Sequence, residues 1–340
     1  MELTKIFSRE RGVWYGFLWN ESDRIGYRKY LSYEVKNNLI LREGRLTVWY
    51  EQHELDAIHT HIVETFTNNT KLFKELVLNL RTDWAQVLPI LSRKTKITVS
   101  TELQNYYQHL VSFWASMNIL YTLPNLAGVT KELQDEALAV RSEAEKYSSN
   151  MELIWIKYWA VHKPEYAVIA NLMTPTEAFQ AAESGLSTEE ITDIKTREAG
   201  SFLFNGKLYL AIELDAVLAS NGLTLPKEDT ESPTELKGTT AYKGKVRGRV
   251  RIISLRKDIP TMQEGEVLVT EMTDPEYLPA VRKAVAVVTD EGGITCHVAI
   301  TARELKKPTI TGTKIATQVF RDGDLVEVDA DNGVVRVLKP

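Results

Sequence analysis

The chain has 340 residues, of which 44% are hydrophobic, and its formal net charge is −5 at pH 7. This length suffices for two or three domains with cores of their own, and the negative charge argues against nucleic-acid binding. The single cysteine excludes an internal disulfide framework, and no apolar run reaches the ~18 residues of a membrane span. We therefore expect a soluble, cytoplasmic protein without a membrane segment or an export signal.

The N-terminal two thirds of the chain show mainly helical periodicity. The exception is NNLILREGRLTVWYEQ (37–52), where apolar and polar residues alternate on both sides of a Glu-Gly pair, which predicts a β-hairpin. Residues 100–124 then predict a long buried helix. Its N-cap is expected at Ser100 or Thr101, and its end before Pro124.

Shorter amphipathic stretches follow this helix. They predict helices over residues 130–147, 151–163, 174–185 and 187–200. Thr174 and Ser187 are the expected N-caps, and Gly185 and Gly200 the expected stops. The pattern predicts a mainly helical domain over residues 1–222.

A change of composition divides the chain after this domain. The stretch LTLPKEDTESPTELKG contains two prolines and four acidic residues, which is typical of a solvated linker, and we assign residues 223–237 to it. Residues 238–340 then contain short Val- and Ile-rich runs separated by glycine turns, with one helix over 295–305. The predicted fold class is α+β, with the helical domain followed by a compact α/β domain.

The stretch TDEGGITCHVAITAREL (289–305) carries the strongest functional signal. The preceding AVAVVTD predicts a strand, the paired glycines a turn, Thr295 an N-cap, and His297 a place in the first helical turn. Free N–H groups and the helix dipole favour an anion there and keep the imidazole neutral, so that its nitrogen can attack phosphorus. The pattern favours a phosphohistidine. The alternative is a histidine that merely caps the helix or lies on the surface.

A resemblance to a known family strengthens this interpretation. The run GGITCHVAITAREL is preceded by LVTEMTDPEYLPAVRKAVAVVTD and followed by KKPTITGT and DGDLVEVDADNGVVRVL. These segments resemble, in order, the mobile phosphohistidine domain of phosphoenolpyruvate-utilising enzymes, such as phosphoenolpyruvate synthase and rifampin phosphotransferase. The resemblance implies a β/β/α swivelling domain whose histidine is phosphorylated at one site and delivers the phosphoryl group at another.

The resemblance also implies roles for individual residues. His297 would be the phosphoryl carrier, and the residues expected to position or bind phosphate are Gly292, Gly293, Thr295, Cys296 and Arg303. Arg303 and Glu304 match the family's helix end, where they either pin the helix or touch phosphate. In some relatives the residue matching Thr295 is a regulatory phosphorylation site, which this sequence does not decide. We expect Asp290 and Glu291 to be solvated turn acids, although they could instead orient the ring.

Other candidate sites carry weaker signals. His53, His59 and His61 are spaced so that they scatter around a helix, and we expect solvated residues and no metal site. Trp155 and Trp159 could line an acceptor pocket, but core packing is the expected role. Cys296 stands at a helix N-terminus, where thiols can be reactive, but in this motif we expect a neighbour of the nucleophile.

Segments at 8–30 and 196–216 are similar to the helical region before the swivelling domain in the same family, where the acceptor substrate binds or packs. No G-x-x-x-x-G-K-[ST] loop occurs, and residues 1–237 leave no room for the family's ATP-grasp domain or its phosphoenolpyruvate barrel. We therefore expect the chain alone to bind no cofactor.

The predicted function is that of a phosphotransferase component. A separate ATP-grasp protein would use ATP and Mg²⁺ to phosphorylate His297, which would pass the group to a small-molecule acceptor. The alternative is a non-catalytic adaptor or regulatory protein that retains a swivelling domain. The sequence does not identify the acceptor, the oligomeric state, or whether the original donor is ATP or phosphoenolpyruvate.

Overall fold

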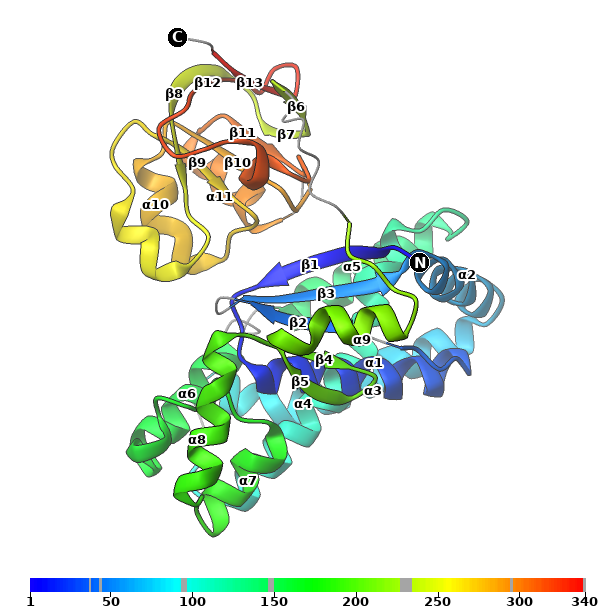
Figure 1. Cartoon of the computed structure of the whole chain (residues 1–340). Helices are drawn as coiled ribbons and strands as arrows, with labels where there is room; N and C mark the ends of the chain where they lie inside the picture. Colours follow the sequence, from blue (N-terminus) through cyan, green and yellow to red (C-terminus); the bar gives the residue numbers. More distant parts are fainter. Residues whose placement is uncertain are drawn as a thin grey trace. The chain divides into compact units, whose positions relative to one another are not determined.

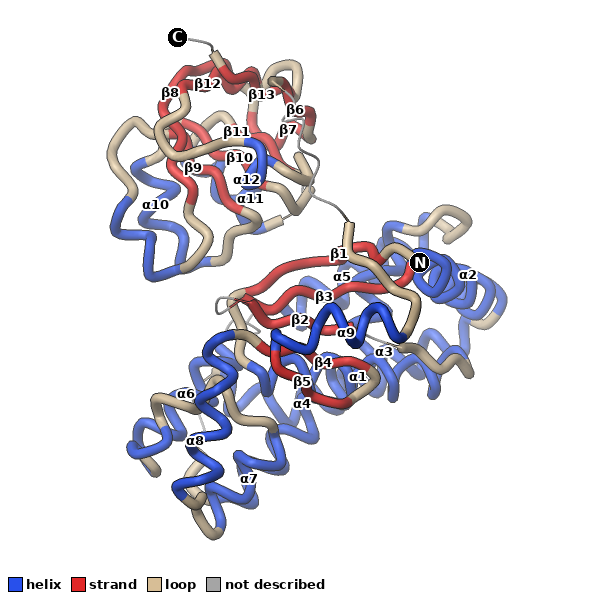
Figure 2. Tube along the Cα trace, in the orientation of Figure 1, coloured by secondary structure: helices blue, strands red, loops and turns tan. Residues whose placement is uncertain are grey.

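A computed structural model describes residues 1–36, 38–42, 45–92, 97–145, 150–226, 234–293 and 296–338. The chain forms two compact units, Met1–Pro226 and Lys227–Pro340 (Figure 1). The first unit is mainly helical and the second contains a mixed sheet with short helices (Figure 2). The predicted α+β fold class is confirmed.

Helices supply most of the first unit. They are α1 (Val13–Leu31), α2 (Gln52–Asn68), α3 (Thr70–Leu91), α4 (Ser100–Thr122), α5 (Lys131–Glu145), α6 (Asn150–His162), α7 (Pro175–Glu183), α8 (Thr188–Thr196) and α9 (Leu214–Ser220). Helix α4 is buried over most of its length, as its apolar spacing predicts, and ends before Pro124. Helix α1 lies tightly against it, because a Cβ atom at Gly26 would come within 2.2 Å of the Ala115 carbonyl oxygen.

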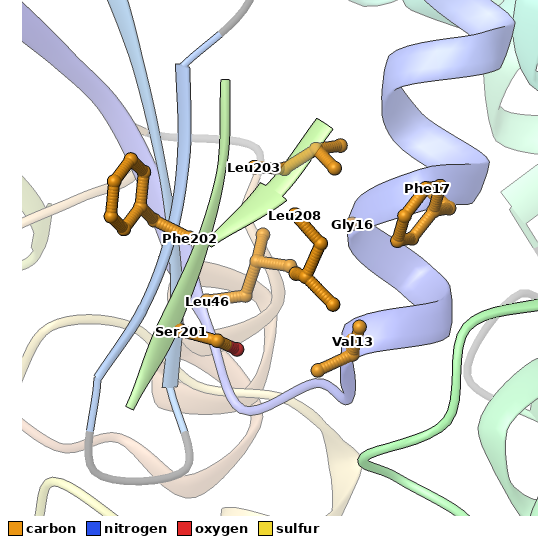
Figure 3. Close-up of a pocket in the computed structure, with 8 residues that line it drawn as sticks. All are labelled: Val13, Gly16, Phe17, Leu46, Ser201, Phe202, Leu203 and Leu208. Carbon is orange, nitrogen blue, oxygen red and sulfur yellow. The ribbon is translucent and has the colours of Figure 1, made fainter. Parts of the chain in front are cut away.

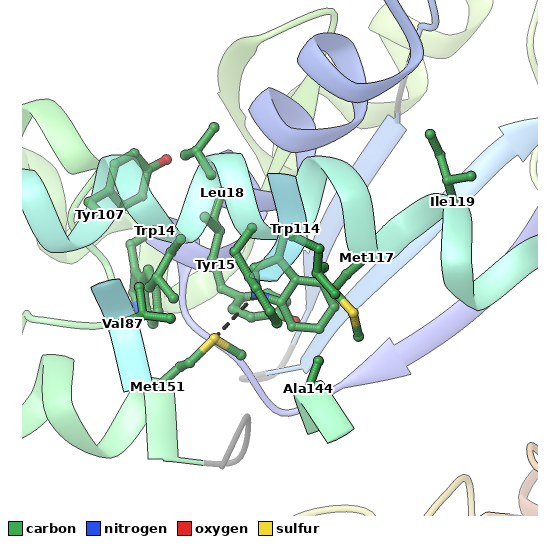
Figure 4. Close-up of a cluster of buried hydrophobic side chains, with 14 of the residues drawn as sticks. Trp14, Tyr15, Leu18, Val87, Tyr107, Trp114, Met117, Ile119, Ala144 and Met151 are labelled. Carbon is green, nitrogen blue, oxygen red and sulfur yellow. Dashed lines mark hydrogen bonds between the residues drawn. The ribbon is translucent and has the colours of Figure 1, made fainter. Parts of the chain in front are cut away.

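Aromatic side chains fill the core of this unit. Trp14 and Trp155 stack with ring centroids 4.7 Å apart. The indole N–H of Trp114 donates to Met151 Sδ at 3.2 Å (Figure 4). Trp155 and Trp159 are fully buried, and Trp155 Nε1 donates to the Ala170 carbonyl oxygen at 3.0 Å. The expected core role of Trp155 and Trp159 is confirmed.

A five-stranded antiparallel sheet completes the first unit. Its strand order is β1-β3-β2-β4-β5, formed by β1 (Leu3–Arg9), β2 (Asn38–Arg42), β3 (Arg45–Glu51), β4 (Ser201–Phe204) and β5 (Lys207–Leu210). Strands β2 and β3 pair as the predicted hairpin, while Glu43 and Gly44 lie outside the described residues. The β4–β5 hairpin was not predicted. The Asn205-Gly206 pair is a sequence signal for a two-residue hairpin turn. In the structure both residues have positive φ, as this turn requires.

Most of the expected helix ends are confirmed. Thr174 and Ser187 cap α7 and α8 in reciprocal capping boxes, and Gly185 and Gly200 follow with positive φ. The expected cap of α4 was wrong, because Ser100 is already the first helical residue. Glu102 stabilises this helix start instead, since its carboxylate accepts from the backbone N–H of Thr98 at 2.7 Å.

The second unit is built on an eight-stranded sheet with the order β6-β13-β12-β8-β9-β10-β11-β7. The strands are β6 (Glu235–Lys237), β7 (Thr239–Tyr242), β8 (Lys245–Ile252), β9 (Val267–Thr270), β10 (Ala286–Thr289), β11 (Thr309–Thr311), β12 (Leu325–Asp329) and β13 (Val334–Val337). Because Gly238 alone separates β6 from β7, the two ends of the strand order are joined and the sheet curls round on itself.

Strands β8 to β11 form the parallel centre of this sheet. Alternate side chains enter two cores: Val267 and Val269 pack on the side of helix α12 (Ala316–Val319), whereas Leu268 packs on the side of α10 (Leu278–Lys283) and α11 (His297–Leu305). The strands predicted in this region and the helix containing His297 are confirmed. Helices α10 and α12 were not predicted, since both are too short to show a clear helical period.

The expected linker over residues 223–237 was too long at both ends. Leu223 is buried in the core that α9 forms against the first sheet, and Thr224 donates its backbone N–H to the Met1 carbonyl oxygen at 2.9 Å. At the other end, Glu235–Lys237 is strand β6, which pairs with β13. The polar composition did not reveal these pairings because they depend on distant partners. Residues 227–233 lie outside the described residues.

Candidate functional site

His297 is the first residue of helix α11, in the connection between the parallel strands β10 and β11. Strand β9 ends at Thr270 and β10 at Thr289, and both threonines are fully buried. Because parallel strands end at a common edge, the loops after β9 and β10 come together there. Ligands of α/β sheets commonly bind at such an edge.

Two threonines contact the imidazole ring of His297. The Thr273 hydroxyl, in the loop after β9, lies 3.1 Å from Nδ1, and the Thr301 hydroxyl, one helical turn along α11, lies 3.5 Å from Nε2. Thr301 also donates to the His297 carbonyl oxygen at 3.0 Å. Thr273 is only 4% exposed, so its hydroxyl is held in place. Neither threonine was predicted from the sequence, although the four-residue spacing of Thr301 from His297 on one helix was a usable signal.

The imidazole ring of His297 is half-buried. Burial lowers the pKa of His297, and the nearby carboxylates Asp274 and Glu304 oppose this effect. The net direction is downward, so the ring is neutral near pH 7. A neutral ring keeps the lone pair that nucleophilic attack requires.

The start of α11 differs from the prediction by one residue. Cys296 occupies the N-cap position, and its side chain accepts no hydrogen bond from the first turn. The expected cap, Thr295, lies with Ile294 outside the described residues. Val298 and Ala299 are buried, so the first turn that carries His297 is anchored in the core.

The paired glycines before the helix have different structural requirements. Gly292 has φ +105°, and a Cβ atom there would lie 2.9 Å from Cys296 Sγ. A Cβ atom at Gly293 would meet no described residue within 4 Å, and the Gly293 carbonyl oxygen accepts from the Cys296 N–H at 3.1 Å. The turn into the helix therefore requires a glycine at the first position and none at the second.

The expectation that Asp290 is a solvated turn acid was wrong. This side chain is 7% exposed, and its carboxylate accepts from the Thr317 backbone N–H at 3.1 Å and from the hydroxyls of Thr313 and Thr317. It therefore caps α12 and does not orient the imidazole. Burial raises the pKa of Asp290, against the effect of the Thr317 hydrogen bonds. Glu291 is half-buried, and its backbone N–H donates to the Glu271 carbonyl oxygen at 2.8 Å.

Arg303 lies in the last turn of α11. Its Nε donates to the Ala241 carbonyl oxygen at 3.4 Å, which ties the helix end to strand β7. This contact fits the expectation that Arg303 pins the helix. A contact of Arg303 with phosphate stays a prediction.

Three histidines of the first unit, His53, His59 and His61, were weighed as a metal site. Within the described ranges, no group of three or more His, Cys, Asp or Glu side chains could hold a metal ion. His53 is exposed, and His61 packs its ring against Tyr33. Burial lowers the pKa of His59.

A small pocket lies between α1 and the first sheet (Figure 3). Its lining is apolar except for one hydroxyl, and consists of Val13, Gly16, Phe17, Leu46, Ser201, Phe202, Leu203 and Leu208. The Ser201 hydroxyl is buried and has no hydrogen-bond partner among the described residues. The pocket presents no charged group that would hold an ionic substrate.

Comparisons with known proteins bear on the second unit. Residues 262–333 match the family described as PEP-utilising enzyme, mobile domain. The probable phosphoenolpyruvate synthase of Archaeoglobus fulgidus is 48% identical over 108 residues, which is 32% of this chain and 14% of that protein. The corresponding protein of Pyrococcus abyssi is 42% identical over 139 residues (38% and 16%), and the phosphoenolpyruvate synthase of Aeropyrum pernix is 44% identical over 113 residues (32% and 14%).

These matches confirm the resemblance found in the sequence and support a domain related to phosphoryl transfer. The matched family region contains both His297 and Thr273. The chain spans about one seventh of the length of these synthases. No helix in the described part of the chain is both long and apolar enough to cross a lipid bilayer.

Proposed function

We propose that His297 accepts a phosphoryl group from a donor and passes it to an acceptor, as a carrier within a phosphotransferase. The proposal rests on the environment of the His297 ring at the start of helix α11. The pKa of the ring is lowered, and its Nδ1 lies 3.1 Å from the Thr273 hydroxyl. The family match of residues 262–333 supports the same function.

We infer that Nε2 is the attacking atom. Nδ1 has the shorter contact, and we assign the ring proton to Nδ1, directed at the Thr273 hydroxyl, which leaves the lone pair on Nε2. Nε2 attacks the phosphorus atom, the N–P bond forms, and the bond from phosphorus to the donor's leaving oxygen breaks with its electron pair. Positive charge develops on the ring during this step, so the Nδ1–H bond to Thr273 strengthens in the transition state.

The reverse chemistry releases the phosphoryl group. An acceptor oxygen attacks phosphorus, the N–P bond breaks, and the electron pair returns to Nε2 while the acceptor loses its proton to solvent. A phosphoryl group on Nε2 would lie near the Thr301 hydroxyl, which is 3.5 Å from that nitrogen.

The donor and the acceptor belong to the proposal as well. We infer that a separate ATP-grasp protein with ATP and Mg²⁺ phosphorylates the ring, and that the acceptor is a small molecule. The apolar pocket beside Ser201 has no charged lining residue, so an ionic acceptor would need another surface.

The test is transfer of labelled phosphate to the full chain. The chain would be incubated with Mg²⁺, ATP labelled at both its β- and γ-phosphoryl groups and the ATP-grasp domain of a phosphoenolpyruvate synthase, and the label mapped by mass spectrometry at neutral pH. We expect one acid-labile, alkali-stable phosphoryl group on His297, absent from His297→Ala. His53→Ala, which removes an exposed histidine, is the matched control and should keep the label. A label that persists in His297→Ala would refute the proposal, and no label at all would favour the adaptor alternative.

A further inference from the structure

We propose that Arg256 is a positioning residue for His297: through its ion pair with Asp274 it holds Thr273 against the ring and offsets the negative charge beside it. This inference deepens the proposed carrier function and rests on it. Arg256 stands at the start of a short 3-10 helix (Arg256–Thr261) and lies outside the stretch that signalled the histidine site.

The ion pair has a well-defined geometry. Arg256 Nη2 lies 2.6 Å and Nε 3.1 Å from the same carboxylate oxygen, Asp274 Oδ2. Nε is also 3.2 Å from Glu276 Oε2. The Arg256 and Asp274 side chains are 22% and 21% exposed, so the pair is shielded more than a surface salt bridge.

Asp274 uses its other oxygen to shape the loop that carries Thr273. Oδ1 accepts from the Glu276 backbone N–H at 2.9 Å, and the Asp274 carbonyl oxygen accepts from the Tyr277 N–H at 3.0 Å. Tyr277 is buried in the core beneath α10 and α11. With both carboxylate oxygens bonded, the turn has little freedom, and the neighbouring Thr273 hydroxyl stays at Nδ1 of His297.

The same pair sets the charge around the ring. Asp274, from the loop after β9, and Glu304, from α11, are the carboxylates that raise the pKa of His297 against the effect of burial. A phosphoryl group on the ring would bring up to two further negative charges to this place. The Arg256 guanidinium lowers the resulting repulsion, because it lies in direct contact with Asp274.

The experiment uses the full chain with ¹⁵N-labelled histidine and follows the His297 ring by NMR as a function of pH. In Arg256→Gln the uncompensated Asp274 charge should raise the pKa of His297 by about half a unit, and loosening of Thr273 should mix the two tautomers. Asp274→Asn should lower the pKa of His297. The double variant should return it to within a few tenths of a unit of the wild-type value.

Glu304→Gln is the matched control, since it removes the other carboxylate without touching the Thr273 loop. It should lower the pKa of His297 and leave the tautomer unchanged. An unchanged pKa and tautomer in Arg256→Gln would overturn the inference, as would an equal change of tautomer in Glu304→Gln. Because NMR requires no phosphoryl donor, this result is independent of the labelling experiment, which tests the carrier function itself.

Discussion

The hydroxyl of Thr273 lies 3.1 Å from Nδ1 of His297, although the two residues are 24 positions apart in the chain. Thr273 follows strand β9 and His297 follows strand β10, and these strands are adjacent and parallel. The hydrogen bond therefore joins the loop after β9 to the first turn of α11 at one edge of the sheet, and fixes the orientation of the proposed nucleophile.

Replacing this hydroxyl by a methyl group should slow phosphorylation of His297. Thr273→Val keeps the volume of the buried side chain but removes the partner of Nδ1. The loss of one hydrogen bond, about 1–1.5 kcal/mol, corresponds to a roughly tenfold lower rate constant. Thr273→Ser keeps the hydroxyl and should stay near the wild-type rate. Single-turnover labelling measures both, and equal rates for Val and Ser would contradict the role of this bond.

The rate of phosphorylation should resist acidification. Burial lowers the pKa of His297, so the ring stays unprotonated at pH values where an ordinary histidine, with a pKa of about 6.5, is already charged. The rate constant should be constant from about pH 8 to below pH 6.5 and fall only at lower pH. Single-turnover labelling across this range, with the donor domain in excess, gives the midpoint. A midpoint above 6.5 would mean that the carboxylates outweigh burial.

The two glycines before α11 should respond differently to alanine. Gly292→Ala places a Cβ atom 2.9 Å from Cys296 Sγ at φ +105°, so the turn must distort, at a cost of about 1–3 kcal/mol. In Gly293→Ala the new Cβ atom meets none of the described residues within 4 Å, so this variant should be tolerated. Hydrogen exchange of the α11 amides in the full chain reports the difference. Equal exchange rates in the two variants would show that the turn does not depend on Gly292.

Asp290 should stabilise α12 and have little effect on the histidine. Asp290→Ala removes the acceptor of the Thr317 N–H from a buried place, which costs about 1–3 kcal/mol, whereas Asp290→Asn retains an acceptor oxygen. Amide exchange at Val319 and Phe320, which donate to Ile315 and Ala316, should accelerate in the alanine variant only. If the NMR signals of the His297 ring also shift in Asp290→Ala, Asp290 belongs to the histidine site.

Several parts of the fold were predictable because their signals are local. The capping boxes at Thr174 and Ser187 need only residues three positions apart, and the burial of α4 follows from its own apolar spacing. The β4–β5 hairpin was missed although its Asn205-Gly206 turn is also a local signal. The burial of Leu223 and the pairing of β6 with β13 could not be predicted, because each depends on a segment far away in the chain.

The same division holds for the candidate site. His297 could be placed at the start of a helix after a glycine turn from residue order alone, because strand, turn and helix are contiguous and each has a local pattern. The groups that surround the ring follow from the fold. Thr273 reaches Nδ1, Arg256 reaches Asp274, and Asp290 turns away to cap α12 because the strand order brings separate loops to one edge of a parallel sheet. Such contacts depend on which strands are neighbours, and local residue patterns do not encode strand order.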